Sequence, residues 1–316
     1  MNMSVLRTKR RRQVRTQSRF RYTDSNSGLN DFSCRTSFLL LLYEKGYGDT
    51  RRMTMKRFTK EGRTLVCFDF DETYFPHACS TEQLKQLRQL ENFLEAHSQH
   101  LSTMWVTGSS LETIREKMTR AGMRYVPHRI AASLGTELYQ VTASGQLELD
   151  TSFSSRFPHD FSGRVHQAVE RLKRVLTIEP QTNLGTSEWM HNYYYFGESE
   201  AEIGLIRSAA RDIGIAVNVS RCNPLAGDPE EAYDIDFIPQ GAGKIAVVDY
   251  VCDRYSFQTE YAYAFGDSGN DLGMLRYVGN GYVLGNGTEE AKREHGRVTE
   301  GMYADGILEV LHRAVR

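Results

Sequence analysis

The sequence predicts an α/β protein in which a parallel-sheet core is interrupted by an inserted α+β cap domain. Two observations predict this fold class. Apolar runs typical of buried strands alternate with segments of helical periodicity in two regions, residues 64–121 and 243–285, which indicates parallel βαβ units. Between these regions, strand-like segments follow one another with only two helices among them, which is typical of an antiparallel sheet with helices on one face.

The core elements are predicted from residue 64 onward. Residues 64–70 form an apolar strand, and residues 81–98 carry leucines at helical spacing. The next expected elements are a strand at 103–107, a helix at 110–121, a helix at 243–255, a strand at 261–267, a helix at 269–278 and a strand at 281–285. Because the strands are apolar along their whole length, we expect a Rossmann-like sheet that is covered on both faces.

The middle of the chain is predicted to be the cap. Its expected elements are two strand-like pieces within 130–150, helices at 160–176 and 199–213, and strands at 191–196, 215–221 and 233–238. The expected organisation is a leader at 1–60, a core made of 61–112 and 239–316, and a cap at 113–238.

The leader is strongly basic. Residues 1–60 hold 15 Lys and Arg against 4 Asp and Glu, in a chain whose net charge is -1. This composition predicts an unpacked tail. Met53 and Met55 shortly precede the first strand and could each be the start of the translated protein. Whether residues 1–52 belong to the native protein is therefore left open by the sequence. Nucleic-acid binding through the leader is the alternative, and the lack of a recognisable nucleic-acid-binding fold in the sequence argues against it.

Bulk composition excludes several protein classes. Hydrophobic residues make up 40% and charged residues 25% of the 316 residues, as in globular domains. The five cysteines are odd in number and show no CxxC spacing, which predicts free thiols and a cytoplasmic protein. The apolar run at 38–43 is too short to span a membrane, so no membrane partner is expected. The composition does not decide whether the protein forms a homodimer.

Two acidic segments follow predicted strands. Asp69 and Asp71 end the first strand, and Asp267 and Asp271 follow the strand at 261–267. In open parallel sheets, ligands bind beyond the carboxyl ends of the strands. Clustered carboxylates repel one another and lose hydration, and a divalent cation removes that cost. The sequence therefore predicts a Mg²⁺ site made by the Asp69 side chain, the Asp71 carbonyl and Asp267.

The same edge offers groups for phosphoryl chemistry. Asp69 can attack phosphorus, and Asp71 can act as acid and base. Thr107 offers a hydroxyl, and Lys244 offers a charge for the phosphoryl group. The remaining candidates are Gly108 and Ser109 at the phosphate, and Asn270 and Asp271, which would orient Lys244 and metal-bound water.

Each motif alone has an ordinary explanation. An Asp at a strand end is usually a turn former, the segment Thr107–Ser110 equally suits a helix N-cap, and a single Lys is usually a surface residue. The occurrence of all of them in this order, each at the end of a βαβ strand, favours a phosphoryl-transfer site.

These motifs resemble the haloacid dehalogenase superfamily over residues 64–316. Its phosphatases carry DxDxT, a strand-end Ser or Thr, a Lys and GDxxND in this order. The resemblance implies an aspartyl-phosphate mechanism with Asp69 as nucleophile, and a large α/β cap of the kind found in sugar-phosphate phosphatases. Glu72 departs from the family, which usually has Gly there. Its side chain would approach the substrate or point to solvent.

Longer strings sharpen the resemblance. DFDETYFPH, WVTGSS, RCNPLAGDPEEAYDIDFIP and AFGDSGND look like superfamily members that act on amino-sugar phosphates in antibiotic biosynthesis. This implies hydrolysis of a hexose 6-phosphate, namely kanosamine 6-phosphate. The alternatives are another hexose 6-phosphate, a phosphosugar mutase, and a sugar-phosphate sensor without activity.

Sugar recognition needs planar polar groups, and an ammonium group needs a carboxylate or an aromatic face. Glu137 is the first candidate for an ammonium partner. Structural roles remain the alternative for every candidate. The others are Tyr74, His77, Gly135, Thr136, His191, Asn192, Arg221, Asn223 and Asp228.

Overall fold

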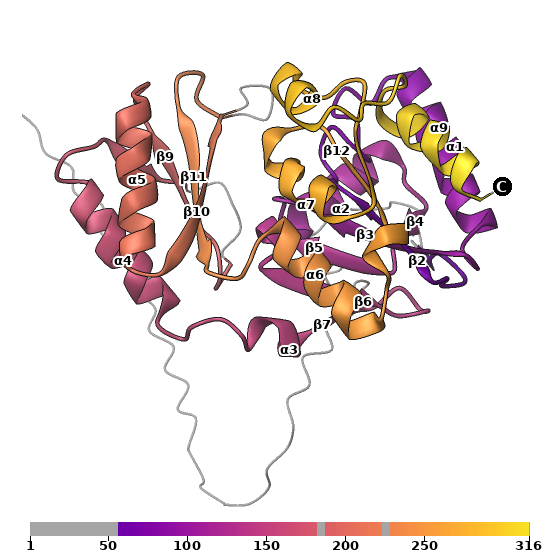
Figure 1. The fold of residues 1–316 in the computed structure, drawn as a ribbon, viewed down its shortest axis with the longest axis horizontal. Coiled ribbons are helices and arrows are strands. Elements are labelled where there is room, and N and C mark those ends of the chain that lie inside the picture. The colour runs from indigo at the N-terminus through magenta and orange to yellow at the C-terminus, as the bar shows by residue number, and fades with distance from the viewer. Residues whose placement is uncertain (1–55, 182–186, 223–227, 316) are drawn as a thin grey trace, which may run out of the picture. The chain divides into compact units, whose positions relative to one another are not determined.

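A seven-stranded sheet forms the centre of the core (Figure 1). The computed structural model describes residues 56–181, 187–222 and 228–315. The strand order is β13-β12-β2-β3-β5-β6-β7, and the first five run parallel. These strands are β2 (Thr64–Phe68), β3 (Leu101–Val106), β5 (Arg129–Ala132), β6 (Glu137–Val141), β7 (Leu147–Leu149), β12 (Tyr263–Gly266) and β13 (Asn280–Val283).

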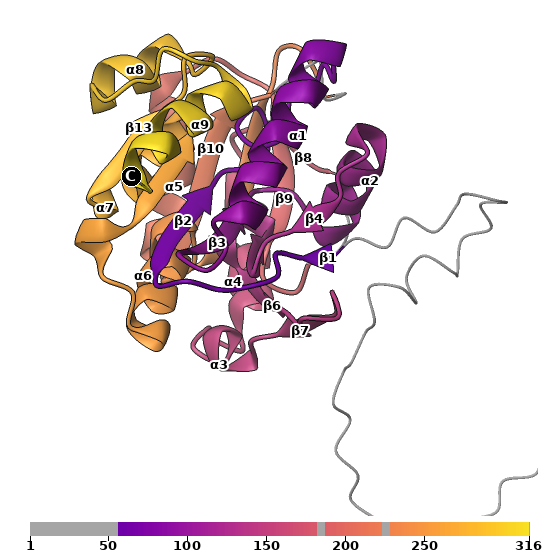
Figure 2. The same cartoon turned by 90° about the vertical axis from the view of Figure 1, so that its right-hand side faces the viewer.

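Helices cover both faces of this sheet, as the apolar strands predict. Along β2, Val66 and Phe68 pack toward α1, α2 and α9, whereas Leu65 and Cys67 pack toward α6 and α7. Figure 2 shows α1 beside α9. The helices are α1 (Thr81–Ala96), α2 (Leu111–Ala121), α3 (Thr151–Ser154), α6 (Lys244–Tyr255), α7 (Leu272–Tyr277), α8 (Glu289–His295) and α9 (Tyr303–Ala314).

Local signals set the ends of the helices nearest the site. Ser80 and Gln83 form a reciprocal capping box at the start of α1. Ser110 caps α2 by accepting a hydrogen bond from the Thr113 amide, and Gly122 ends that helix with a φ of 61°. The start of α2 is therefore fixed directly after the segment predicted to bind phosphate.

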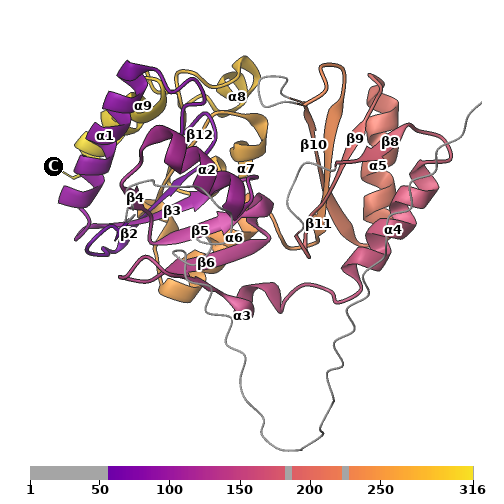
Figure 3. The same cartoon turned by 180° about the vertical axis from the view of Figure 1, so that it is seen from behind.

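The cap contains a separate four-stranded antiparallel sheet in the order β10-β11-β9-β8. Helices α4 and α5 cover one of its faces, as Figures 1 and 3 show. The other face carries polar side chains. The elements are α4 (Phe161–Leu172), β8 (Ile178–Pro180), β9 (His191–Tyr195), α5 (Glu200–Asp212), β10 (Ile215–Arg221) and β11 (Tyr233–Pro239).

The cap begins later than the sequence indicates. The segment 113–149, expected in the cap, completes α2 and then contributes β5, β6 and β7 to the core sheet. β5 pairs in parallel with β3, and the β6–β7 hairpin extends the same sheet antiparallel. Adjacent strand signals indicate antiparallel pairing but carry no information about which sheet the strands join, so the boundary placed at 113 is wrong.

Three further findings complete the fold. A short parallel pair joins β1 (Lys56–Arg57) to β4 (Tyr125–Val126), and 3-10 turns lie at Ser133–Gly135, Thr259–Tyr261 and Gly269–Asp271. In the described part of the chain no helix has the length and apolarity needed to cross a membrane. Among the described cysteines, Cys67, Cys79, Cys222 and Cys252 are free thiols, which agrees with the cysteine pattern.

Candidate active site

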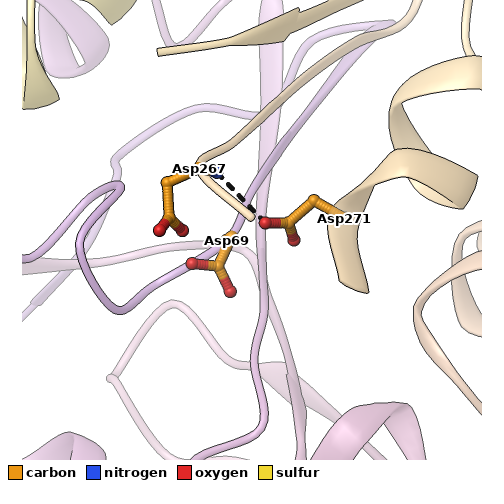
Figure 4. A group of neighbouring side chains, drawn as sticks. All are labelled: Asp69, Asp267 and Asp271. Atoms are coloured by element: carbon orange, nitrogen blue, oxygen red, sulfur yellow. Dashed lines mark hydrogen bonds between the residues drawn. The ribbon is translucent and has the colours of Figure 1, made fainter. Parts of the chain in front are cut away.

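Three carboxylates meet beyond the carboxyl ends of β2 and β12. Asp69 follows β2, while Asp267 and Asp271 flank the turn after β12. Figure 4 shows the three side chains converging, and one oxygen of each lies within 4.8 Å of the others. Because β2 and β12 are parallel neighbours, the sheet itself brings these distant segments together.

Lys244 ties two of these carboxylates together. Its Nζ donates to Asp69 Oδ1 and to Asp271 Oδ1, both at 2.7 Å, and to Asn270 Oδ1 at 3.1 Å. The Lys244 side chain is only 5% exposed, so this ion pair is desolvated. Lys244 is the first residue of α6 and directly follows Gly243, whose φ of 112° suits glycine. The predicted link between Lys244, Asn270 and Asp271 is present in this geometry.

The turn after β12 is closed by its own carboxylate. Asp271 Oδ2 accepts hydrogen bonds from the amides of Asp267 and Ser268, both at 3.1 Å. A Cβ on Gly266 would lie 2.4 Å from the Asp271 Cβ, so only glycine allows this approach. Thr73, the last residue of the DxDxT motif, donates to Asp267 Oδ1 at 3.2 Å. The two acidic segments are thereby linked directly.

The cluster of Asp69, Asp267 and Asp271 carries more negative charge than Lys244 offsets. Burial raises the pKa of Asp267 to about 9, with the charges of Asp69 and Asp271 adding to the effect. Burial likewise raises the pKa of Asp69 to about 7, against the opposing charge of Lys244. A buried, oxygen-only group with excess negative charge is what a hard divalent cation prefers. The residues present therefore fit Mg²⁺.

Asp71 lies apart from the three-carboxylate group. Its Oδ2 accepts from Ser109 Oγ at 2.7 Å, and its Oδ1 is bonded by His77 Nε2 at 2.8 Å and by Lys117 Nζ. Burial alone would raise the pKa of Asp71, but the hydrogen bond from His77 and the charge of Lys117 hold that pKa well below its usual range. Asp71 is therefore firmly held and ionised in this arrangement, so it must take up a proton before it can act as an acid.

The segment after β3 supplies small, buried polar groups. Thr107 is fully buried, and its Oγ1 accepts a hydrogen bond from the Ser109 amide at 3.0 Å. A Cβ on Gly108 would lie 3.3 Å from Leu134 Cδ2, so the chain is tightly packed here. The hydrogen bond from Ser109 to Asp71 places this segment beside the loop of Asp71, and phosphate binding by it stays a prediction.

Glu72 is half-buried, and its carboxylate is bonded to other parts of the chain. Its Oε2 accepts from Tyr303 Oη at 2.7 Å, and its Oε1 accepts from the His77 amide at 3.2 Å. Asn286 Nδ2 donates to the Glu72 carbonyl at 2.6 Å. Glu72 adopts a left-handed φ of 55°, a backbone conformation that favours glycine. In this chain the acidic side chain anchors the loop of the nucleophile to the first residue of α9.

The residues after β5 have structural partners. Gly135 lies against the linker before α6, because a Cβ there would be 2.9 Å from the Gly243 carbonyl oxygen. Thr136 is fully buried and donates to the Ser133 carbonyl at 2.8 Å. Glu137 accepts from Tyr139 Oη at 3.0 Å and from Ser187 Oγ at 2.8 Å. The close approach predicted at Gly135 is therefore to the chain itself.

Gly135→Ala tests that contact. At a φ of 71° an alanine costs about 1–2 kcal/mol, and the clash with the linker adds about 1–3 kcal/mol. We expect chemical denaturation to show a loss of about 2–5 kcal/mol. Gly122→Ala is the matched control, since Gly122 has a φ of 61° but nothing within 4 Å of the added Cβ. Equal losses in the two variants would contradict the contact.

The uncovered face of the cap sheet is polar and acidic. Asp236 is nearly buried and accepts from Asn192 Nδ2 at 2.6 Å and from Asn218 Nδ2 at 3.1 Å. Burial, together with the nearby charges of Asp236 and Asp228, raises the pKa of Asp234 to about 6. These side chains alternate along their strands, so they share one face.

Other sugar-reading candidates lie elsewhere. Tyr74 was expected to line the cleft but is fully buried, with its ring edge-on to Phe68 and Trp105. His191 lies on the face covered by α4, where its Nε2 is 3.1 Å from Ser162 Oγ.

Two candidates near the end of β10 complete the set. The Arg221 guanidinium lies 5.1 Å from the Tyr233 ring centre and is not part of the polar face, whereas Asp228 accepts from Tyr194 Oη at 3.0 Å. Asn223 lies outside the described residues.

Some functional candidates were missed by sequence reasoning. Asp234 and Asp236 lie at alternate positions of a predicted strand, and this period of two was a signal that both share one face. Thr73 belongs to the DxDxT motif, but the sequence did not indicate its contact with Asp267. Lys117 lies inside α2, where no local pattern sets it apart from an ordinary surface residue.

Comparison with known proteins shows to which family this chain belongs. The model of the family described as sucrose-6F-phosphate phosphohydrolase matches residues 62–313. The chain is 43% identical over 260 residues to the kanosamine-6-phosphate phosphatase of Bacillus subtilis, covering 79% of this chain and 92% of the relative. It is 31% identical over 258 residues to an uncharacterised hydrolase of Staphylococcus aureus, with 78% and 94% coverage.

Solved structures agree with these matches. A haloacid dehalogenase-like hydrolase from Bacillus subtilis superposes with a TM-score of 0.67 at 40% identity, covering 84% of this chain and 96% of that one. The sucrose-phosphatase of Synechocystis, solved with sucrose and phosphate, gives a TM-score of 0.64 at 19% identity, with 80% and 98% coverage. The second likeness shows the fold alone.

Proposed function

This chain belongs to the sucrose-6F-phosphate phosphohydrolase family, haloacid dehalogenase-type phosphoric monoester hydrolases, and from that premise we propose that it hydrolyses kanosamine 6-phosphate. The arrangement of Asp69, Lys244, Asp267 and Asp271 at the sheet edge is the single observation that carries a phosphoryl-transfer site. The name of the relative at 43% identity supports the choice of sugar.

We propose a two-step reaction through Asp69. The Asp69 carboxylate attacks phosphorus and forms an acyl phosphate, while the bond from phosphorus to the sugar oxygen breaks. Asp71 in its protonated form gives its proton to the departing sugar oxygen, and the carboxylate so formed then takes a proton from the water that hydrolyses the acyl phosphate. Phosphate, sugar and free Asp69 result, and Asp71 recovers its proton.

The remaining residues of the site would neutralise charge and position the phosphoryl group. Lys244 lowers the cost of negative charge on Asp69 and the transferring group, and Thr107 and the Gly108 backbone would hold phosphate oxygens. The Asp69 side chain, the Asp71 carbonyl and Asp267 would hold Mg²⁺, with Asp271 orienting Lys244 beside them, and the cation supplies charge neutralisation for the phosphoryl group when bound. Thr73 keeps Asp267 oriented.

The acidic cap face supports a cationic sugar. Asp228, Asp234 and Asp236 lie close together, and burial first and their mutual repulsion second raise the pKa of Asp234 to about 6. An ammonium group on the substrate would offset this repulsion, whereas a neutral hexose would not. We therefore propose that this face reads the amino group, with Asn192 and Asn218 available for hydroxyl groups.

The test is phosphate release with Mg²⁺ from kanosamine, glucosamine and glucose 6-phosphates across pH. Asp234 becomes charged as pH rises through about 6, so the preference for kanosamine over glucose 6-phosphate in kcat/KM should rise from about pH 5 to pH 7. The ratio cancels the ionisation of the phosphate, which both substrates share. Asp234→Asn should lower the preference by about tenfold and flatten its pH dependence.

Asp212→Asn is the matched control, because it makes the same change on an exposed residue at the end of α5. Equal turnover of all three esters would keep the phosphatase and reject the amino sugar. Absence of phosphate release from every ester would reject the proposed activity.

A further inference from the structure

Two residues of helix α2, one turn apart, contact the loop that carries Asp71. Lys117 donates to Asp71 Oδ1 and, at 3.0 Å, to Ser109 Oγ. Arg120 donates to the His77 carbonyl at 3.3 Å, and its guanidinium lies 4.9 Å from the Phe75 ring centre. The helix thus contacts the beginning and the end of the loop.

The contacts around Asp71 form a closed set. Lys117 and His77 both bond Oδ1, Ser109 bonds Oδ2, and Lys117 also bonds Ser109. The Lys117 side chain is 16% exposed although lysine side chains usually reach into solvent. A flexible side chain immobilised in this way loses conformational entropy, so its contacts must offset that loss.

We propose that Lys117 is a positioning residue that fixes the orientation of the Asp71 carboxyl group, an inference that rests on the proposed function. Without Lys117 the Asp71 carboxylate would keep only His77 and Ser109 as partners among the contacts named above, and Lys244 beside Asp69 is a competing cation. Lys117 adds a charge-assisted hydrogen bond to those that His77 and Ser109 make with Asp71. It acts through Asp71 and does not itself touch the reacting atoms.

Orientation matters because Asp71 serves both steps from one place. It must reach the sugar oxygen in the first step and the attacking water in the second, each within hydrogen-bond distance. A displacement of about 1 Å costs on the order of 100-fold in rate. Removal of Lys117 should therefore lower the rate in the same way as a partial loss of the acid and base function of Asp71.

The experiment compares two esters with different need for an acid. A hexose 6-phosphate loses its sugar as an alkoxide that must be protonated, whereas 4-nitrophenyl phosphate loses 4-nitrophenolate, a stable anion that needs no acid. The kcat/KM value reports only steps through the first phosphoryl transfer. For Lys117→Met we expect kcat/KM on the hexose phosphate to fall by about 30-fold, and on the aryl phosphate by less than about threefold.

A conservative variant and a matched control complete the test. Lys117→Arg keeps the charge and should restore most of the hexose-phosphate rate, and Lys85→Met removes one lysine from the exposed face of α1 and should change neither rate. Equal losses on both esters, or no loss on either, would overturn the positioning role.

The two proposals fail in different ways. If the parent protein prefers another hexose phosphate, the substrate proposal fails and the Lys117 comparison is made with that ester. If the parent releases phosphate from neither the hexose phosphates nor the aryl phosphate, both proposals are overturned.

Discussion

Asp69→Asn should lower phosphate release by about 10⁴-fold or more, because the amide cannot attack phosphorus. The fold should survive, since the amide keeps the shape of the side chain and can still accept a hydrogen bond from Lys244. Removing one carboxylate from a crowded group also relieves repulsion with Asp267 and Asp271. We therefore expect unchanged or slightly higher thermal stability together with lost activity, measured by phosphate assay and calorimetry.

A matched control and a trapping measurement separate chemistry from folding. Asp253→Asn makes the same change on an exposed residue of α6 and should retain full activity. Rapid acid quenching of the parent during turnover should leave a phosphoryl group on the peptide that contains Asp69, detectable by mass spectrometry. Phosphate release by Asp69→Asn at a rate within tenfold of the parent would exclude Asp69 as the nucleophile.

The core fold was largely predictable because local patterns encode it. β2, β3 and β12 are short apolar runs, and α1 combines a capping box with buried leucines on one face. The assignment of β5 to β7 was not predictable in the same way. Their pairing depends on which edge of an existing sheet is available, and that is a tertiary property.

The site shows the same division. Asp69, Lys244, Asp267 and Asp271 were predictable because strand ends of a parallel sheet converge at one edge. Tyr74 follows Asp69 closely in sequence, yet the turn after β2 directs its ring into the core against Trp105. The direction of such a turn depends on the packing around it and is not encoded in neighbouring residues.

The role proposed for Lys117 depends on the same kind of information. Its target is a loop 46 residues earlier in the chain, and the contact exists only because α2 packs beside that loop. Charge and helical position alone describe Lys117 as an ordinary exposed lysine. Sequence patterns therefore identify groups at strand ends more reliably than groups that act on them from a helix.

Lys244→Met should be the most destabilising change at the site. Lys244 is the shared partner of Asp69 and Asp271, whose side chains are 7% and 0% exposed. Burial by itself would lower the pKa of Lys244, but these two carboxylates raise it above its ordinary value, so the ammonium is held charged. Removing one partner of a buried ion pair costs about 3–5 kcal/mol. Activity should fall as well, because the charge beside the phosphoryl group is lost.

The dependence of that loss on pH and Mg²⁺ follows from the charges left behind. Without Lys244 the buried carboxyl groups have raised pKa values, so the native state holds protons that the unfolded state has released, and stability falls as pH rises from about 4 to 8. Mg²⁺ binds only the native state and offsets the same charge. Calorimetry should show a larger loss near pH 8 than near pH 5, and a larger gain with Mg²⁺ in Lys244→Met than in the parent. Lys85→Met is the control, and an equal Mg²⁺ gain in the parent and in Lys244→Met would argue against a cation site at these carboxylates.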